Sequence, residues 1–317
     1  NGNNKKTKSL YKDVRQMYNE HPFPNVREHP PSKTDERFKF IYDQFLKIDL
    51  SSITNRIVMD AGCGTGENTW AFRRIIPDST QVIGVDLSFN SIKIARSQQK
   101  SPQENIAFAN GSLLELGIES ESIDLVISSG VLVAVPDPYS AYQELIRVLK
   151  PGGKIVLVLY HRYGRAAHAF RRGILRLLAG DNVAKRARIA DKLFAPSINR
   201  LSKIGPTTYE ATLYDQYALP CESRYSVGQI LDWFNNSNIS YLCTWPPVEF
   251  EKLGTALEFS VNHPNLQKDF FISFLKSIKP KKTANRKVAP GYINRAIIEF
   301  FWMLDNLQLF AISGIKK

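Results

Sequence analysis

A glycine-rich turn is the feature of the chain with the clearest chemical meaning. Asp60 ends an apolar run, and glycines then occupy every second position of residues 62–66. Alternate glycines let a backbone turn tightly and approach a ligand where any Cβ would collide. The spacing GxGxxG of dinucleotide-binding turns is not completed, because Glu67 or Thr69 stands where the last glycine belongs. Glu67 also disfavours a pyrophosphate at the start of the next helix.

Further polar residues follow the next predicted strands. Asp86 ends the apolar run 81–86, twenty residues after Gly66, and Asn110, Gly111 and Ser112 follow the run 106–109. An ionised carboxylate is a strong acceptor for the two hydroxyls of a vicinal diol, which suits Asp86 to a ribose. The alternative for Asp86 is an ordinary helix cap.

The elements that would position these residues alternate along the chain. Short β-branched runs predict strands at 56–60, 81–86, 106–109, 123–128 and 153–160, with helices at 67–76, 91–99 and 139–149 between them. This order predicts right-handed βαβ units and a doubly wound α/β sheet, in which ligands bind at the carboxyl ends of the strands. We expect 239–244 and 309–315 to complete a seven-stranded, mostly parallel sheet, with one of them antiparallel to the rest.

These segments resemble class I S-adenosylmethionine-dependent methyltransferases over about residues 55–160. The residues 60–66 look like motif I, Asp86 like the residue that binds the ribose, and 110–112 like the loop beside the adenine, although the family often has Asp at Ser112 and His at Ala134. The resemblance implies a Rossmann-like methyltransferase fold with helical insertions, an enzyme, and S-adenosyl-L-methionine as cofactor. The cofactor contacts that it implies are Asp60, Gly62, Cys63, Gly64, Gly66, Asp86, Leu87, Ser112, Leu113 and Ser128.

The acceptor site is less constrained by these patterns. Methyl transfer from a sulfonium is an in-line displacement, which needs a general base only where the acceptor loses a proton. Candidate catalytic residues are His161, at the end of the fifth strand, and Tyr18 and His21 on a proline-rich arm; each histidine has a purely structural alternative. The predicted acceptor pocket comprises Tyr18, Phe23, Tyr160, His161, Tyr214, Tyr217 and Arg224.

The remaining chain divides around this core. We predict an N-terminal tail and covering arm (1–30), a cofactor-binding α/β core (31–160), a basic helical insertion (161–213), a core continuation (214–250), a second helical insertion (251–308) and a final strand (309–317). Within these, residues 1–9 are polar and basic and predict a frayed tail, 14–18 a short helix, and 38–50 an amphipathic helix.

Composition predicts a folded protein of the cytoplasm. The 317 residues are 43% hydrophobic and 23% charged. Three cysteines without a CxxC pair favour neither a disulfide framework nor a zinc site. The sequence contains no run of eighteen apolar residues, so it predicts no transmembrane segment, and no signal peptide is evident.

The net charge of +12 is concentrated in one segment. Residues 162–203 hold eleven Lys and Arg against two Asp. The preferred interpretation is that this segment is a solvated lid over the active site of an enzyme. That enzyme would methylate an O, N or C nucleophile of a small molecule or peptide, and the acceptor could be anionic. The alternatives are an RNA methyltransferase that uses the segment as a phosphate footprint, and a non-catalytic membrane or partner-binding module with Phe170, Ile174, Leu177 and Leu178 on an amphipathic face.

Overall fold

The computed structural model describes residues 2–25, 35, 39–99, 104–203, 207–246, 299 and 307–317. None of the helices in this part of the chain combines the length and the apolarity that crossing a membrane requires. The predicted second insertion, 251–308, lies almost entirely outside the described residues, so its helical character stays a prediction.

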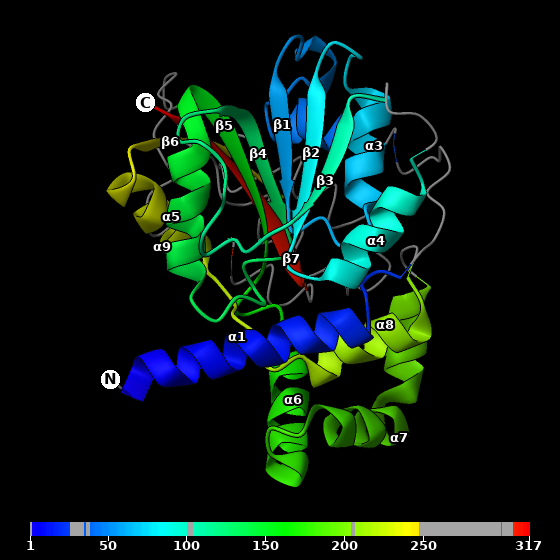
Figure 1. Ribbon diagram of the computed structural model, residues 1–317. Coiled ribbons are helices and arrows are strands. Elements are labelled where there is room, and N and C mark those ends of the chain that lie inside the picture. Colours follow the sequence, from blue (N-terminus) through cyan, green and yellow to red (C-terminus); the bar gives the residue numbers. More distant parts are fainter. Residues whose placement is uncertain are drawn as a thin grey trace, which may run out of the picture.

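A seven-stranded sheet forms the centre of the protein, in the order β3-β2-β1-β4-β5-β7-β6 (Figure 1). The strands are β1 (Ile57–Ala61), β2 (Gln81–Asp86), β3 (Ile106–Asn110), β4 (Ile123–Ser129), β5 (Leu149–Tyr160), β6 (Ile239–Trp245) and β7 (Leu309–Lys316). Strands β1 to β5 pair in parallel, whereas β7 is antiparallel to both of its neighbours, β5 and β6. The predicted doubly wound sheet with two paired C-terminal strands is confirmed. The strand order reverses between β1 and β4, which is where such sheets bind ligands.

Helices cover both faces of the sheet, which explains the nearly continuous apolar strands. Helices α3 (Glu67–Ile75) and α4 (Phe89–Ser97) pack on one face, and α5 (Pro138–Val148) and α9 (Val227–Asn236) pack on the other. Each pair of helices forms an apolar core with the sheet. Along β4, the side chains of Leu125 and Ile127 pack into the core on the α3 and α4 side, and Val126 packs into the core on the α5 and α9 side.

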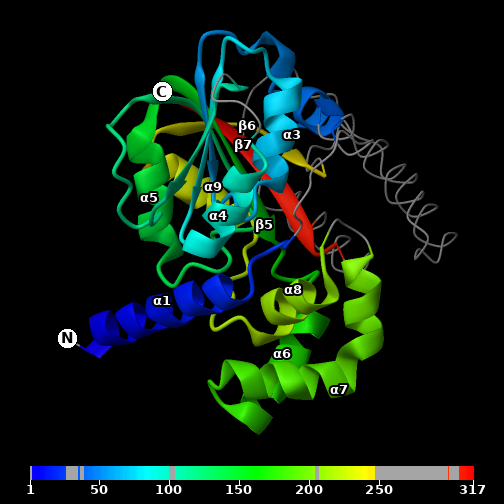
Figure 2. The ribbon, with the colours of Figure 1, turned by 45° about the vertical axis from the view of Figure 1, so that its right-hand side comes forward.

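A helical layer lies beyond the carboxyl edge of the sheet (Figure 2). The basic segment forms α6 (Ala166–Ala179) and α7 (Val183–Ser202), followed by α8 (Tyr209–Leu213) and a π-helical turn, η4 (Tyr214–Ala218). These elements share a small core of their own, which includes Leu175, Ala190 and Ile198. Helix α1 (Gly2–Glu20) crosses between this layer and the sheet.

Two local predictions are wrong. The tail predicted at 1–9 and the short helix at 14–18 are one helix, α1, which Val14 and Met17 anchor by burying their side chains. The helix predicted at 38–50 is interrupted: a π-helical turn, η1 (Ile41–Phe45), is followed by a 3₁₀ turn, η2 (Leu50–Ser52). The Asp43 carboxylate accepts the Leu50 N–H at 3.1 Å and so stabilises the break between them.

Candidate functional site

The turn between β1 and α3 has a backbone that only glycine adopts readily. Gly62, Gly64 and Gly66 have φ angles of +86°, +53° and +91°. A Cβ on Gly62 would collide with the Val131 side chain, and one on Gly64 with the Phe23 carbonyl. The N–H of the residue after Gly64 donates to that same carbonyl at 3.1 Å. The arm that follows α1 therefore closes directly over the glycine turn.

Asp86 lies beside this turn as the last residue of β2. One of its carboxylate oxygens accepts the Gly64 N–H at 2.9 Å and the other accepts the Ser88 N–H at 2.8 Å. A carboxylate oxygen has two lone pairs, so each can accept one further hydrogen bond. Asp86 is thus rigidly held, and it can still accept hydrogen bonds from two hydroxyl groups.

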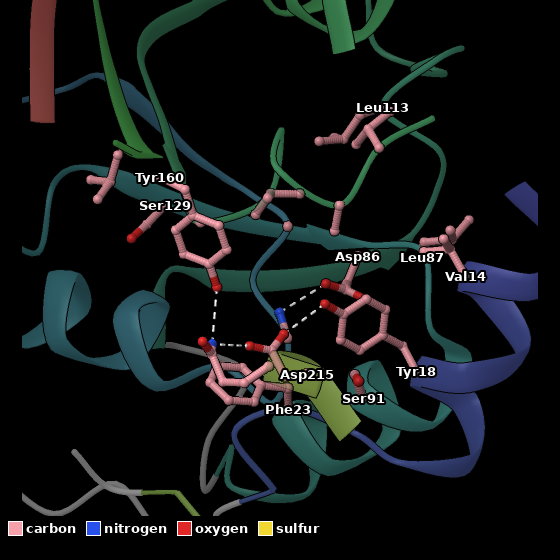
Figure 3. A pocket seen from close by; sticks show the side chains of 18 of the residues that line it. Val14, Tyr18, Phe23, Asp86, Leu87, Ser91, Leu113, Ser129, Tyr160 and Asp215 are labelled. Carbon is pink, nitrogen blue, oxygen red and sulfur yellow. Dashed lines mark hydrogen bonds between the residues drawn. The ribbon is translucent and has the colours of Figure 1, made fainter. Parts of the chain in front are cut away.

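A cavity of about 460 Å³ extends from the glycine turn along the carboxyl edge of the sheet (Figure 3). Its walls come from α1, the glycine turn, the loops after β2, β3 and β4, the end of β5, and η4. Val14, Leu87, Leu113, Val131 and Pro136 make much of this wall apolar. The volume is typical of a small-molecule site.

A polar cluster forms the end of the cavity near η4 (Figure 3). The Tyr18 hydroxyl donates to Asp215 at 2.8 Å. The Gln216 side-chain amide donates to the other Asp215 oxygen at 2.7 Å and to the Tyr160 hydroxyl at 3.0 Å. All four residues line the cavity. Burial raises the pKa of Asp215 above its usual value, although the hydrogen bonds from Tyr18 and Gln216 oppose this.

Arg165 orients this cluster from behind. Its guanidinium lies 3.6 Å from the centre of the Tyr160 ring and donates to the side-chain amide oxygen (Oε1) of Gln216 at 3.1 Å. That bond turns the Gln216 amide NH₂ toward Asp215. Arg165 also pairs with the buried Glu222 carboxylate at 3.0 Å. The positive charge of Arg165 is therefore balanced within the protein.

Three carboxylates surround the glycine turn without a cationic partner. Burial raises the pKa of Asp60 and of Glu67 to about 7 each, and that of Asp86 above its usual value. Among the described residues, none of the three forms an ion pair. The Thr69 hydroxyl donates to Asp60 at 2.6 Å. This end of the cavity therefore favours a ligand that brings positive charge.

The structure brings together some of the predicted site residues and leaves others outside the cavity. Those that line it are Gly62, Gly64, Asp86, Leu87, Leu113, Tyr18, Phe23 and Tyr160. Those that do not are Asp60, Cys63, Gly66, Ser112, Ser128, His21, His161, Tyr214, Tyr217 and Arg224. Several of the second group support the turn or the sheet: Gly66 caps α3, and the Ser112 hydroxyl accepts the Leu114 N–H at 3.0 Å.

Neither candidate histidine reaches the cavity. His161 is fully buried, its Nδ1 accepts the Gly164 N–H at 3.1 Å, and burial lowers its pKa to about 4. His21 stacks on Tyr214 with 3.3 Å between the ring centroids and lies 2.9 Å from a carboxylate oxygen of Glu210. These geometries describe packing and the docking of the arm on α8, and they do not support a catalytic role.

Sequence reasoning missed Asp215, Gln216 and Arg165. Of the segment 214–217, only Tyr214 and Tyr217 are predicted to line the acceptor pocket. In the π-helical turn η4 it is Asp215 and Gln216 that line the cavity, whereas Tyr217 is buried in the core of the helical layer. The available signal was Asp215 itself, because a carboxylate that is removed from water requires a partner.

The fold and the glycine turn define a Rossmann-like methyltransferase domain. A family model described as "Methyltransferase domain" matches residues 59–157, within that fold. Residues 59–157 are therefore similar to methyltransferase domains, as the motifs in this part of the chain predict.

The sequence similarity to individual proteins covers about a third of the chain. Demethylmenaquinone methyltransferase of Lactococcus lactis subsp. lactis is 34% identical over 110 residues, which cover 34% of this chain and 44% of that protein. Arsenite methyltransferase of Mus musculus is 32% identical over 113 residues, covering 32% and 30%. The chain thus spans less than half the length of these relatives. The structure of PKMT2 from Rickettsia typhi in complex with AdoHcy has a similar fold, with a TM-score of 0.56 at 16% identity, and covers 88% of this chain and 52% of that chain.

Proposed function

We propose that this protein transfers a methyl group from S-adenosylmethionine to a small-molecule acceptor bound in the same cavity. The observation that carries the proposal is the continuity of that cavity. It joins Asp86 and the glycine turn at one end to the cluster of Tyr18, Asp215 and Tyr160 at the other. Donor and acceptor would meet in one cavity, where positioning supplies much of the rate.

The donor end fits the cofactor by charge and by shape. The glycine turn admits a ligand against its backbone, and Asp86 can accept hydrogen bonds from both ribose hydroxyls. The carboxylates of buried Asp60 and half-buried Glu67 would be stabilised in their charged forms by the sulfonium and ammonium groups of the ligand. When bound, the cofactor supplies an electrophilic methyl group.

The acceptor end suits a mostly apolar molecule with one proton-bearing nucleophile. The nucleophilic O–H or N–H would donate to Asp215, which Tyr18 and Gln216 hold in place. As the new bond to the methyl carbon forms, the carbon–sulfur bond breaks with its electron pair on sulfur, and the proton passes to Asp215. The apolar walls exclude water from this step.

The relatives and the burial of charge both favour a small acceptor over RNA. The relatives are named for methylation of demethylmenaquinone and of arsenite. Of the eleven cations in 162–203, Arg165, Arg172 and Arg186 are buried and bound to groups of this chain. They are therefore not available to phosphates, which weakens the RNA alternative.

The test combines cofactor binding with labelling. We expect calorimetry to detect S-adenosylmethionine binding, and Asp86→Ala to weaken it by roughly 1.5–3 kcal/mol, the scale of a lost charged hydrogen bond. With cofactor labelled in its methyl group, the wild-type protein should label a low-molecular-mass compound in a cell extract. Tight binding without any labelled small product would contradict the proposed transfer, whereas unchanged affinity in folded Asp86→Ala would contradict the assigned donor site.

A further inference from the structure

Helix α6 buries polar side chains and exposes apolar ones. Its inner face buries His168 and Arg172 together with Leu175. Its outer face carries Phe170 and Leu177, which are 72% and 86% exposed. In a helix of an ordinary soluble protein the apolar residues face the core and the charged residues face water.

The inner polar side chains are fully engaged. The Arg172 guanidinium donates to the carbonyl oxygens of Leu219 at 2.7 Å and Gln216 at 2.9 Å, and lies 3.7 Å from Glu222. His168 lies 2.9 Å from the Gln216 carbonyl oxygen. The helix therefore cannot rotate to bury its apolar face without breaking these contacts.

The exposed face forms a continuous uncharged stripe. At 100° per residue, Phe170, Ile174 and Leu177 lie one above another, and the residues that flank them on the outer surface are Ala166, Ala167, Gly173 and Leu178. Arg171 and Arg176 border the stripe on its two sides. We call the uncharged residues named here the α6 stripe.

The segment that contains the stripe is rich in positive charge. Eight Lys and Arg side chains of 162–203 are exposed or half-buried, and only Asp181 and Asp191 oppose them. Figures 1 and 2 both show α6 and α7 at the end of the molecule that projects beyond α1, away from most of the sheet. The stripe is therefore presented on a protruding, cationic part of the protein.

We propose that the α6 stripe binds an anionic membrane surface. Apolar side chains at the centre would enter the boundary between lipid headgroups and acyl chains, and the surrounding cations would pair with the headgroups. A nucleic acid would match the cations but would leave Leu177 and Ile174 in water. A second copy of this chain would match the apolar stripe but would bring like charge against like charge. The proposal is independent of the methyl acceptor, although Arg165, directly before α6, lines the cavity.

Vesicle co-sedimentation of the full chain tests the proposal. The probes are vesicles of phosphatidylcholine alone and vesicles with about 30% phosphatidylglycerol, which mimic neutral and anionic surfaces. We expect binding to the anionic vesicles that weakens as salt is added. The double variant Phe170→Glu, Leu177→Glu should weaken binding by at least about tenfold, because it removes two apolar anchors and adds like-charge repulsion.

A matched control distinguishes binding by the α6 stripe from non-specific binding by any exposed apolar side chain. Phe89 is 57% exposed on α4, away from the stripe, so Phe89→Glu should bind the anionic vesicles as the wild type does. Unchanged circular dichroism and S-adenosylmethionine affinity would show that the double variant is folded. The proposal is overturned if the wild type ignores anionic vesicles at low salt, or if the double variant binds them equally well. It is also overturned if the double variant abolishes self-association or RNA retention while the wild type binds no vesicles.

Discussion

At the scale of single residues, the carboxylates around the glycine turn couple ligand binding to protons. Without a ligand, burial holds the pKa of Asp60 and of Glu67 at about 7, so each is partly protonated near neutral pH. A positively charged ligand favours the ionised forms and lowers both pKa values. Binding should therefore release protons, and it should tighten as pH rises through about 7.

Calorimetry in buffers of different ionisation enthalpy measures this release. We expect S-adenosylmethionine affinity to increase between about pH 6 and about pH 8, the interval around the raised pKa values. Asp60→Asn keeps an acceptor for the Thr69 hydroxyl and should reduce both the proton release and the slope. A flat affinity profile in the wild type would show that these carboxylates do not respond to the ligand.

Asp215 is expected to control the chemical step. Replacing it with Asn preserves the shape of the cluster but removes the proton acceptor, and should lower labelled-product formation by about 10²–10⁴-fold. Because burial raises the pKa of Asp215, the wild-type rate should rise with pH at values above the usual carboxylate range. In the Asp215→Asn variant the rate should no longer rise with pH in this range, and the affinity for the cofactor should be unchanged. A variant with normal turnover would exclude proton transfer to this side chain.

At the scale of elements, buried ion pairs connect the helical layer to the loop before α9. Glu222 is buried, with Arg165 at 3.0 Å and Arg172 at 3.7 Å. Removing one partner of a buried ion pair leaves an uncompensated charge, which costs about 3–5 kcal/mol. Glu222→Gln should lower the free energy of unfolding by about that amount, measured by urea denaturation.

The control is a carboxylate of the same type on the surface. Glu121 pairs with Lys316 at 3.2 Å and is 54% exposed, so Glu121→Gln should change the free energy of unfolding by less than about 1 kcal/mol. If the two variants were equally stable, the buried cluster would not hold the layer in place.

At the scale of the whole molecule, the last strand joins the edge strand β6 to the rest of the sheet. β7 lies between β5 and β6 and buries Phe310 and Ile312. Deleting residues 309–317 would expose two strand edges and open the apolar core, so we expect no soluble protein. Deleting Lys317 alone should leave expression and melting temperature unchanged. A 309–317 deletion that keeps its melting temperature and cofactor affinity would contradict a structural role for β7.

The sequence by itself determined the sheet and the donor end of the cavity. Apolar runs, glycine spacing and the acidic ends of β1 and β2 are local signals, since each depends on residues close together in the chain. The strands, the positive φ angles of the glycine turn and the place of Asp86 in the cavity wall follow from them.

Only the tertiary structure decided which side chains meet at the acceptor end of the cavity. Asp215 and Gln216 line the cavity in place of Tyr214 and Tyr217 because the rotation of a short π-helical turn is set by packing and not by periodicity. The burial of Arg172 depended on Glu222, fifty residues further along the chain. Long-range pairing of this kind leaves no repeating pattern in the sequence, and the same pairing turns the apolar face of α6 toward the solvent.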